Sequence, residues 1–238
     1  MPKLSFILPC YNAYEWIGEC LQSLLTQTEK DIEIIIVEDC STDGTREWLM
    51  EYKNNELAPL FPFDERVKII FNETNIGAGA SRNKGTEIAT SSIIGICDAD
   101  DIYADQRAEL IIKHFELNPK SEMVNFPYIC IGYYNEQLEE FGGEAFNHEQ
   151  FIKTGNINYF SNPSMAVRKD SLVEVGGYGH EVFNEKERTT DDYALVSKWV
   201  KAGKIIDFQP GYCVTFHRNL QNSMMTKVRG WSADWVQK

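Results

Sequence analysis

Three carboxylates within four residues, Asp98, Asp100 and Asp101, form the densest group of reactive side chains in the sequence. They directly follow residues 93–97, an apolar run with the composition of a buried strand. Carboxylates this close repel one another unless a cation or hydrogen-bond donors balance their charge. A hard divalent ion that takes one or two carboxylates together with substrate phosphate oxygens supplies such a balance. The turn therefore predicts a site for a metal ion and a diphosphate.

Helix capping and calcium binding both fit this turn less well. Capping of the next helix accounts for one aspartate near a helix start, but not for three behind a strand. A calcium-binding loop would place Asp98, Asp100 and Glu109 at its first, third and twelfth positions. Such a loop needs an oxygen ligand at the fifth position and glycine at the sixth. The sequence has Ile102 and Tyr103 there, which excludes a calcium loop.

The turn needs a rigid frame, and the first half of the chain has the pattern of one. Four short apolar runs have the composition of strands: residues 4–8, 32–37, 67–71 and 93–97. Amphipathic segments of helical periodicity separate them: residues 13–26, 45–53 and 79–89. Apolar strands that alternate with helices predict an α/β protein with a mostly parallel sheet covered on both faces. Ligands bind at the carboxyl ends of such strands, so the chemistry is expected in the loops that follow them.

The loops after the other three strands also carry side chains that could bind a ligand. They are Pro9 and Tyr11 after the first strand, Glu38 and Asp39 after the second, and Asn75, Gly77 and Arg82 after the third. Because the strands are predicted to be parallel, these loops and the acidic turn lie at one edge of the sheet. The convergence of carboxylates and amides predicts a ligand site at that edge.

The segment 77–82 (GAGASR) partly matches a dinucleotide-binding loop, because it follows a strand and opens a helix. Its third small position is occupied by Arg82, however, and the strand before it is not the first of the chain. The match is weak, and the glycines are expected only to let the chain turn. Two interpretations of Arg82 stay open: it faces a ligand at the helix start, or it is a solvated surface arginine.

The second half of the chain has a less regular pattern. The expected elements are helices over 105–117, 170–175 and 192–202, a short strand over 164–168, and closing strands over 205–208 and 212–216. No repeat or low-complexity linker divides the sequence. We therefore expect a single domain over residues 1–238.

Composition narrows the class of protein. The 238 residues carry a formal charge of −13, so the chain lacks the basic surface that nucleic-acid binding requires. Its six cysteines are far apart with no CxxC pair, which argues against zinc and indicates free thiols in a reducing compartment. The start has no signal-peptide pattern, and no run approaches the roughly 20 apolar residues of a membrane span. A cytoplasmic location is expected.

With these loops in view, the chain resembles a family 2 glycosyltransferase of the GT-A fold. The matching stretches are 8–12 (LPCYN), 37–45 (VEDCSTDGT), 75–83 (NIGAGASRN), 98–101 (DADD), 176–178 (GGY) and 190–195 (TDDYAL). They occur in the family's order over roughly 200 residues, which is more specific than any one motif. The resemblance implies a Rossmann-like, mostly parallel central sheet flanked by helices. It also implies a nucleotide-sugar-binding half, residues 1–104, and an acceptor-binding half with a closing segment, residues 105–238.

The resemblance also implies residue roles. The implied donor nucleotide-binding residues are Pro9, Tyr11, Glu38, Asp39, Asn75, Gly77, Arg82, Asp98 and Ala99. Among these, Tyr11 would pack on the base, Asp39 would hydrogen-bond the base or ribose, and Asp98 would hold the ribose. Asp100 would ligate Mn²⁺ or Mg²⁺ across the diphosphate.

Two implied roles have alternatives. The general base would be Asp192 or Asp191, and Asp192 matches the family position better, although Thr189 and Asp192 also have the spacing of a capping box. The family often has Arg-x-His near its end, but here Thr215 stands two residues before His217. His217 is predicted as a second metal residue, with a structural role as the alternative.

The function implied by the resemblance is inverting, metal-dependent transfer of a sugar from a UDP-sugar to a hydroxyl of a glycan or glycolipid. Aromatic residues that could either stack on acceptor sugars or belong to the core are Tyr128, Tyr133, Tyr134, Phe146, Tyr159 and Phe160, and Trp231 and Trp235 would dock on a membrane or partner or cover the core. Peripheral association with the inner face of a membrane would give access to a lipid-linked acceptor. The alternative is a non-catalytic sugar-nucleotide-binding protein that retains the donor loops. The aspartate pair 191–192 counts against that alternative, because binding alone needs no base.

Overall fold

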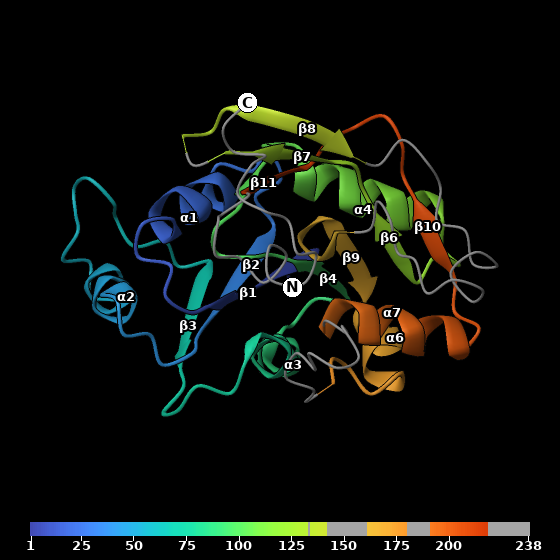
Figure 1. Ribbon diagram of the computed structural model, residues 1–238, viewed down its shortest axis with the longest axis horizontal. Coiled ribbons are helices and arrows are strands. Elements are labelled where there is room, and N and C mark those ends of the chain that lie inside the picture. Colours follow the sequence, from blue (N-terminus) through green and yellow to red (C-terminus); the bar gives the residue numbers. More distant parts are fainter. Residues whose placement is uncertain (133, 142–160, 180–190, 219–238) are drawn as a thin grey trace.

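The computed structural model describes residues 1–132, 134–141, 161–179 and 191–218, and it shows two β-sheets with helices packed around the larger one (Figure 1). The larger, central sheet has seven strands: β1 (Leu4–Cys10), β2 (Ile32–Glu38), β3 (Val67–Phe71), β4 (Ile93–Ile96), β6 (Met123–Asn125), β9 (Met165–Arg168) and β10 (Ile206–Phe208). Their order across the sheet is β10-β6-β9-β4-β1-β2-β3. Strands β1 to β4 are parallel, and β9 runs antiparallel to both its neighbours. The expected α/β class with a mostly parallel central sheet is confirmed.

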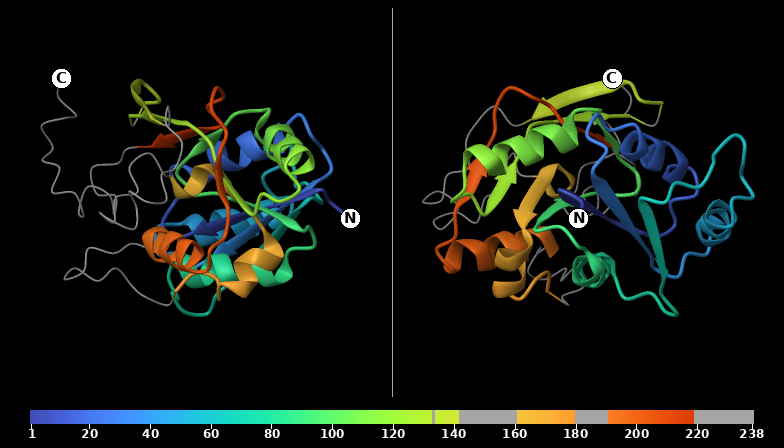
Figure 2. Two further views of the ribbon diagram at one scale, coloured as in Figure 1. Left: turned by 90° about the vertical axis from the view of Figure 1, so that its right-hand side faces the viewer. Right: turned by 180° about the vertical axis from the view of Figure 1, so that it is seen from behind.

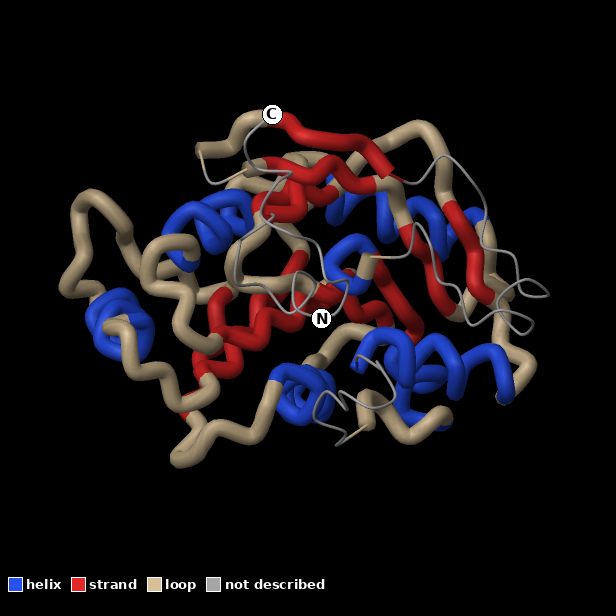
Figure 3. Tube along the Cα trace, in the orientation of Figure 1, coloured by secondary structure: helices blue, strands red, loops and turns tan. Residues whose placement is uncertain are grey.

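Helices cover both faces of the central sheet (Figures 1 and 3). They are α1 (Ile17–Leu25), α2 (Thr45–Lys53), α3 (Ala78–Ile88), α4 (Arg107–Leu117), α6 (Lys169–Glu174) and α7 (Asp191–Lys201), with a short 3₁₀ helix, η1 (Asn162–Ser164). Helices α1 and α4 lie on one face, whereas α3, α6 and α7 lie on the other, as the side view also shows (Figure 2). Within the described residues, no helix has the length and apolar character that crossing a membrane requires.

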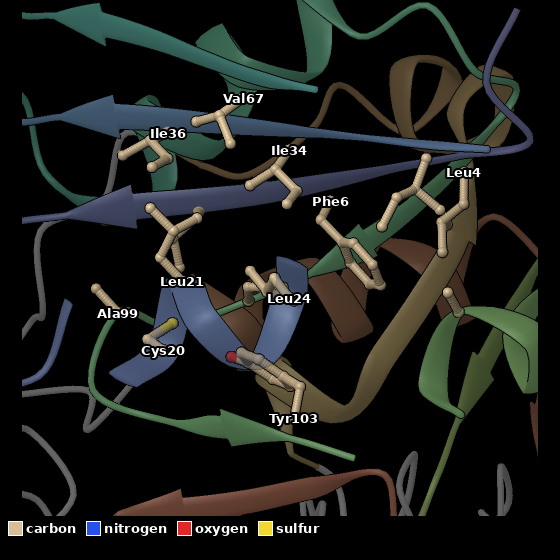
Figure 4. Packing of buried hydrophobic residues seen from close by; sticks show 14 of the residues in the cluster. Leu4, Phe6, Cys20, Leu21, Leu24, Ile34, Ile36, Val67, Ala99 and Tyr103 are labelled. Atoms are coloured by element: carbon tan, nitrogen blue, oxygen red, sulfur yellow. The ribbon is translucent and has the colours of Figure 1, made fainter. Parts of the chain in front are cut away.

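Alternation along the strands builds a separate core on each face of the sheet. Leu4 and Phe6 of β1 point toward α1, where they join Leu24 in one apolar cluster (Figure 4). Ile7 points to the opposite face and packs in a second cluster that includes Trp199 of α7. Both faces are apolar because both are covered, which is why the strands are continuous hydrophobic runs.

The second sheet has four strands and lies beside α1 and α4. Its order is β5 (Ile102–Tyr103), β11 (Thr215–Arg218), β7 (Tyr128–Ile131) and β8 (Gln137–Phe141). The sequence analysis placed a strand at 212–216, but β11 begins only at Thr215. Gly211, with φ +94°, and the exposed Tyr212 still belong to the preceding turn. The last strand therefore lies three residues later than its apolar pattern indicated.

Helix α1 also begins later than the expected residue 13. The N–H of Ala13 donates to Thr45 Oγ1 at 2.8 Å, and the N–H of Tyr14 donates to Asp43 Oδ2 at 3.0 Å. These bonds fasten the loop after β1 to the loop after β2. The chain becomes helical only at Ile17, because its preceding residues are held in a turn by a neighbouring loop.

Glu33 joins three strands at the end of the sheet opposite the acidic turn. Its carboxylate accepts hydrogen bonds from Ser5 Oγ at 2.5 Å, Lys68 Nζ at 2.6 Å and the Thr90 N–H at 2.6 Å. Burial raises the pKa of this carboxyl, but these donors outweigh burial and lower the pKa to about 2. The folded protein thus stabilises the charged form of Glu33 more than the unfolded chain does.

Replacing Glu33 by glutamine is expected to lower the free energy of unfolding at neutral pH by about 2 to 3 kcal/mol. Because the folded-state pKa lies near 2 and the unfolded value is 4.5, the contribution is complete above the unfolded pKa and disappears as pH falls through the folded one. Urea unfolding between about pH 2 and pH 7 should show the two proteins converging in acid. Glu29→Gln, which breaks an exposed pair with Lys3, serves as the control and should cost under about 1 kcal/mol. An equal loss in both variants would contradict the prediction.

Candidate active site

The acidic turn lies at the point where the strand order of the central sheet reverses. Strand β4 pairs with β1, from which the chain continues through β2 and β3 on the other side. The last ladder bond runs from the Cys97 N–H to the Ile7 carbonyl at 2.9 Å. The chain then turns, and the Asp101 N–H donates to the Asp98 carbonyl at 3.3 Å. Such a reversal point leaves a crevice at the carboxyl ends of the strands, where α/β proteins bind ligands.

Asp101 is a buried anchor of the turn, with 0% exposure. His217 Nδ1 lies 3.1 Å from its carboxylate, and the Arg218 N–H donates to Oδ1 at 2.8 Å. Burial lowers the pKa of His217, but the nearby Asp101 outweighs it and raises the pKa to about 9. A carboxylate behind a histidine ring is the arrangement that orients metal-binding imidazoles. Residues 101 and 217 are thus brought together by the pairing of β5 with β11.

Asp100 lies beside this pair in a crowded, negatively charged environment. Burial, Asp101 and Asp98 together raise the pKa of its carboxyl to about 7. A bound cation would relieve that repulsion, and carboxylate oxygen is a ligand suited to Mn²⁺ or Mg²⁺, whereas imidazole nitrogen suits a transition metal better than Mg²⁺. Across the part of the chain that the structure describes, no group of three or more His, Cys, Asp or Glu side chains is arranged to hold a metal. A metal at Asp100 and His217 therefore stays a prediction, in which substrate and water would supply the remaining ligands.

Arg218, which the sequence analysis did not identify, holds the turn from behind. Its Nε donates to the Asp100 carbonyl at 2.9 Å, and its Nη2 donates to Glu19 Oε2 at 2.8 Å. The guanidinium also lies over the ring of Trp16 at 4.3 Å. One buried side chain from the last described strand thereby fixes the acidic turn against α1 and the segment that leads into it.

Arg82 forms the main electrostatic link of the site. Its guanidinium bonds to Asp98 Oδ1 at 2.6 Å and forms a second ion pair with Asp191. The side chain is only 5% exposed, so the interpretation of Arg82 as a solvated surface arginine is wrong. The residue lies in the first turn and a half of α3, and it joins the turn after β4 to the start of α7.

Two further residues surround the Arg82 guanidinium. It lies over the ring of Tyr178 at 5.2 Å, which favours a desolvated cation. With the Asn162 amide nitrogen donating to Tyr178 Oη at 2.9 Å, the Asn162 amide oxygen lies 3.0 Å from Arg82 Nη2. The sequence analysis noted Tyr178 only as part of a glycine-pair motif and did not identify Asn162. An Asn-Pro pair in an irregular segment gives no periodic signal that could have revealed it.

The glycines of α3 permit a close approach between the two halves of the chain. A Cβ on Gly79 would lie 3.2 Å from the Gly179 carbonyl oxygen and 3.5 Å from Asp191 Cβ. The next link is Asn83, whose amide group donates to the Tyr178 carbonyl at 2.9 Å and accepts from the Tyr178 N–H at 2.8 Å. Gly79 thus serves helix packing, whereas Gly77, with φ +86° and no atom within 4 Å of a Cβ position, lets the chain turn as expected.

Asp191 and Asp192 open α7, with their carboxylates at the same edge of the sheet as Arg82. Asp191 Oδ1 accepts from the Asp192 N–H at 3.1 Å, and Asp192 Oδ1 accepts from the Tyr193 N–H at 2.8 Å. Thr189, the other member of the expected capping box, lies outside the described residues. The structure thus brings the two candidates for the general base and the acidic turn into one network, in which Asp191 is ion-paired directly to Arg82.

The two carboxylates at the end of β2, Glu38 as its last residue and Asp39 directly after it, are turned into the protein. Asp39 is 2% exposed, and its oxygens accept from the Ile76 N–H at 2.9 Å and the Gly77 N–H at 2.8 Å. Its carbonyl accepts from Asn75 Nδ2 at 3.1 Å. Glu38 is fully buried and pairs with Arg46 at 2.6 Å. In this structure these residues shape the donor loops, and direct contact with a nucleotide stays a prediction.

Three more expected donor residues have different surroundings. Pro9 is still part of β1, where it pairs with Val37, so the first loop begins two residues later than expected. Tyr11 is 50% exposed at the carboxyl edge of the sheet, as a residue that stacks on a base must be. The Ala99 side chain is buried in the core beside Cys20 (Figure 4), so its contact with a nucleotide stays a prediction.

Few of the expected acceptor residues lie in the described ranges. Tyr128 is buried and packs edge-on against His217, with ring centroids 6.1 Å apart, whereas Tyr134 is 86% exposed. Outside the described residues lie Tyr133, Phe146, Tyr159, Phe160, Trp231 and Trp235. Tyr128 thus supports the histidine behind the turn.

The central sheet has the strand order β3-β2-β1-β4, with the acidic turn at its reversal point and Asp191 and Asp192 across from that turn. This arrangement is that of a transferase of the GT-A type. Comparison with known proteins agrees. Residues 5–176 match the model of the family described as Glycosyl transferase family 2. The chain belongs to that family.

Relatives and solved structures support the same assignment. The glycosyltransferase MJ1057 of Methanocaldococcus jannaschii is 30% identical over 202 residues, 84% of this chain and 64% of the relative. YibD of Escherichia coli is 40% identical over 99 residues, 42% of this chain and 26% of the relative. The chain thus spans less than two thirds of these relatives' lengths.

Two solved structures share the fold at low identity. S. aureus TarS in complex with UDP-GlcNAc superposes with a TM-score of 0.70 at 20% identity, covering 94% of this chain and 60% of that one. The mannosyltransferase PcManGT from Pyrobaculum calidifontis, in complex with GDP-Man and Mn²⁺, gives a TM-score of 0.63 at 18% identity and covers 94% and 58%.

Arg82→Met is expected to lower the free energy of unfolding by about 3 to 5 kcal/mol, because it leaves the carboxylates of Asp98 and Asp191 without their cationic partner in a largely buried network. Urea unfolding measures the loss. Adding Asp191→Asn should restore part of the stability, since one stranded charge is removed. Lys3→Met breaks an exposed ion pair and should leave the stability nearly unchanged. A loss in Arg82→Met no larger than in Lys3→Met would show that Arg82 does not bridge the two segments.

Proposed function

We propose that this chain is an inverting, metal-dependent glycosyltransferase that moves a sugar from a UDP-sugar to a hydroxyl group of a glycan or glycolipid. The observation that carries the proposal is the Arg82 bridge, which joins Asp98 at the end of β4 to Asp191 at the start of α7. Donor-side and acceptor-side carboxylates are thereby fixed within one network. Residues 1–104 then bind the donor, and residues 105–238 supply the acceptor side and the closing segment.

On the donor side, the nucleotide would lie along the carboxyl edge of β1, β2 and β4. Tyr11, whose ring is half exposed there, is placed to stack on the base. Asp98 would hold the ribose, while the buried Asp39 keeps the loop at residues 75–77 in position. A UDP donor is supported by the shared fold with TarS, which was solved with UDP-GlcNAc. PcManGT was solved with GDP-Man, so GDP is the nucleotide against which UDP binding should be compared.

The metal residues of the proposal are Asp100 and His217. When bound, Mn²⁺ or Mg²⁺ would stabilise the negative charge of the departing nucleoside diphosphate without a proton donor. PcManGT, which has the same fold, was solved with Mn²⁺. Asp101 orients the His217 ring, and Arg218 fixes the Asp100 carbonyl, so the chain holds both residues in place.

On the acceptor side, we assign the general base to Asp192. A sugar hydroxyl is a poor nucleophile, and a carboxylate within hydrogen-bond reach accelerates its attack by about 10²- to 10⁴-fold. Asp191 is engaged by the Arg82 guanidinium, so its charge is already committed to a structural ion pair. Asp192 is the next carboxylate along the helix start and matches the family position better, and inversion requires only one base.

UDP in the presence of Mn²⁺ is expected to raise the melting temperature by about 5 °C or more at saturation, because ligand binding stabilises the folded state. Differential scanning fluorimetry measures the shift. Asp100→Asn should abolish the contribution of Mn²⁺ to that shift, whereas Asp105→Asn, a carboxylate just beyond the turn, should preserve it. A shift with GDP and none with UDP would overturn the assigned donor, and no effect of Mn²⁺ on the wild type would overturn the metal site.

Asp192→Asn is expected to lower kcat for transfer by about 10²- to 10⁴-fold while leaving UDP binding intact, because only proton removal from the acceptor is lost. Single-turnover assays with a panel of nucleotide sugars and acceptors give the rate, and calorimetry gives the affinity. Asp191→Asn is the matched variant, and it should lower stability as well as rate because it leaves Arg82 short of a partner. Undiminished transfer by Asp192→Asn would remove it as the base. Donor binding without transfer in the wild type would favour the non-catalytic alternative.

A further inference from the structure

The backbone of the acidic turn leaves the sheet before its first aspartate. The ladder between β1 and β4 ends with the Cys97 N–H, so the peptide groups on both sides of Asp98 need other partners. Their orientation matters, because the two peptide planes decide where the carboxylates that follow will point. The side chains that hold these peptides come from the core beneath the turn, rather than from the crevice.

One hydroxyl group satisfies both peptides. Tyr103 Oη accepts a hydrogen bond from the Asp98 N–H at 2.7 Å and donates to the Asp98 carbonyl at 3.1 Å. The Cys20 thiol lies 3.5 Å from the same carbonyl. Tyr103 is almost fully buried and lies near Leu24 in the apolar cluster, to which Ala99 also belongs (Figure 4). A hydroxyl that both donates to and accepts from one residue restrains rotation on both sides of its Cα.

A buried arginine supports that tyrosine. The guanidinium of Arg107 lies 4.3 Å from the Tyr103 ring centroid and 5.1 Å from that of Phe6, so it lies against two aromatic rings. It donates to the Ile96 carbonyl at 2.5 Å and to Cys97 Sγ at 3.2 Å. Among the described residues these contacts take the place of a carboxylate partner, and the Arg107 side chain is completely buried. Its positive charge therefore lies directly beneath the last residues of β4.

We propose that Tyr103 and Arg107 are positioning residues, which hold the backbone of the acidic turn from within the core and so set the directions in which Asp98 and Asp100 face the nucleotide and the metal. Together the two side chains contact the backbone of Ile96 and Asp98 and the thiol of Cys97. Neither side chain reaches the crevice, so their effect on ligands passes through the turn. The ligands named here rest on the proposed function.

The test uses two variants that each remove one buried tyrosine hydroxyl. Tyr103→Phe removes the group that holds Asp98. Tyr52→Phe is the matched control, because Tyr52 Oη accepts from the Asp64 N–H at 3.0 Å within a buried aromatic cluster far along the sheet from the turn. Both variants keep the ring, so packing is preserved. Tyr103→Phe loses two hydrogen bonds and Tyr52→Phe one, so the melting temperature is expected to fall somewhat more in Tyr103→Phe.

Hydrogen exchange without any ligand gives the first measurement. A peptide covering residues 97–103 should exchange faster in Tyr103→Phe than in wild type, since the Asp98 N–H loses its acceptor, and it should be unchanged in Tyr52→Phe. Unchanged exchange in Tyr103→Phe would overturn the inference whatever the protein binds. Arg107→Lys keeps the charge but shortens the reach to Ile96 and Cys97, and the same increase is expected there.

Calorimetric titration gives the second measurement. The apparent affinity for Mn²⁺ in the presence of UDP should fall about tenfold in Tyr103→Phe, the size seen when residues that orient metal ligands are lost, and stay within about twofold in Tyr52→Phe. Equal affinities in the two variants would overturn the positioning role. If wild type showed no Mn²⁺-dependent UDP binding, the proposed function would fail, and the exchange result would still decide whether Tyr103 holds the turn.

Discussion

Electrostatic repulsion at the end of β4 is the constraint on which much of this structure depends. Asp98, Asp100 and Asp101 come within four residues of one another, and burial increases the cost of their charge. The compensating groups come from distant segments: Arg82 from α3, and His217 and Arg218 from β11. The charge balance of the acidic turn therefore depends on contacts from both β11 and α3.

The second sheet supplies two of the groups that offset this repulsion. Strand β5 directly follows the turn and pairs with β11, which brings His217 to Asp101. Strand β7 supports β11 from the other side and carries Tyr128 against the histidine ring. The small sheet thus acts as a support for the acidic turn, because it connects residue 101 to residue 217 with backbone hydrogen bonds on both sides. The central sheet with its helices would supply Arg82 but would leave the turn without His217 and Arg218.

Hydrogen bonding within the loops explains why several polar residues at the sheet edge face inward. Asp39 is occupied by the N–H groups that lead into α3, and Glu38 is paired with Arg46. These bonds set the shape of the loops between which a ligand would lie. A residue can thus be essential to a binding site through the backbone it holds, as Tyr103 does for the acidic turn, without its side chain facing the ligand.

Local sequence pattern predicted the elements of the first half well, because an apolar run or an amphipathic period reflects burial that each segment experiences along its own length. The parallel sheet, the helices between its strands and the position of the acidic turn at its edge all follow from such patterns. The partners of that turn do not. Arg82 could be a surface residue or a ligand contact until α7 and Tyr178 were packed against it, and nothing in the sequence marked Asn162 or Arg218. Their roles arise from contacts across 80 residues or more of chain. The sequence by itself determined where the charges are, and only the tertiary structure decided which groups neutralise them, because Coulombic and hydrogen-bond energies depend on distances in space.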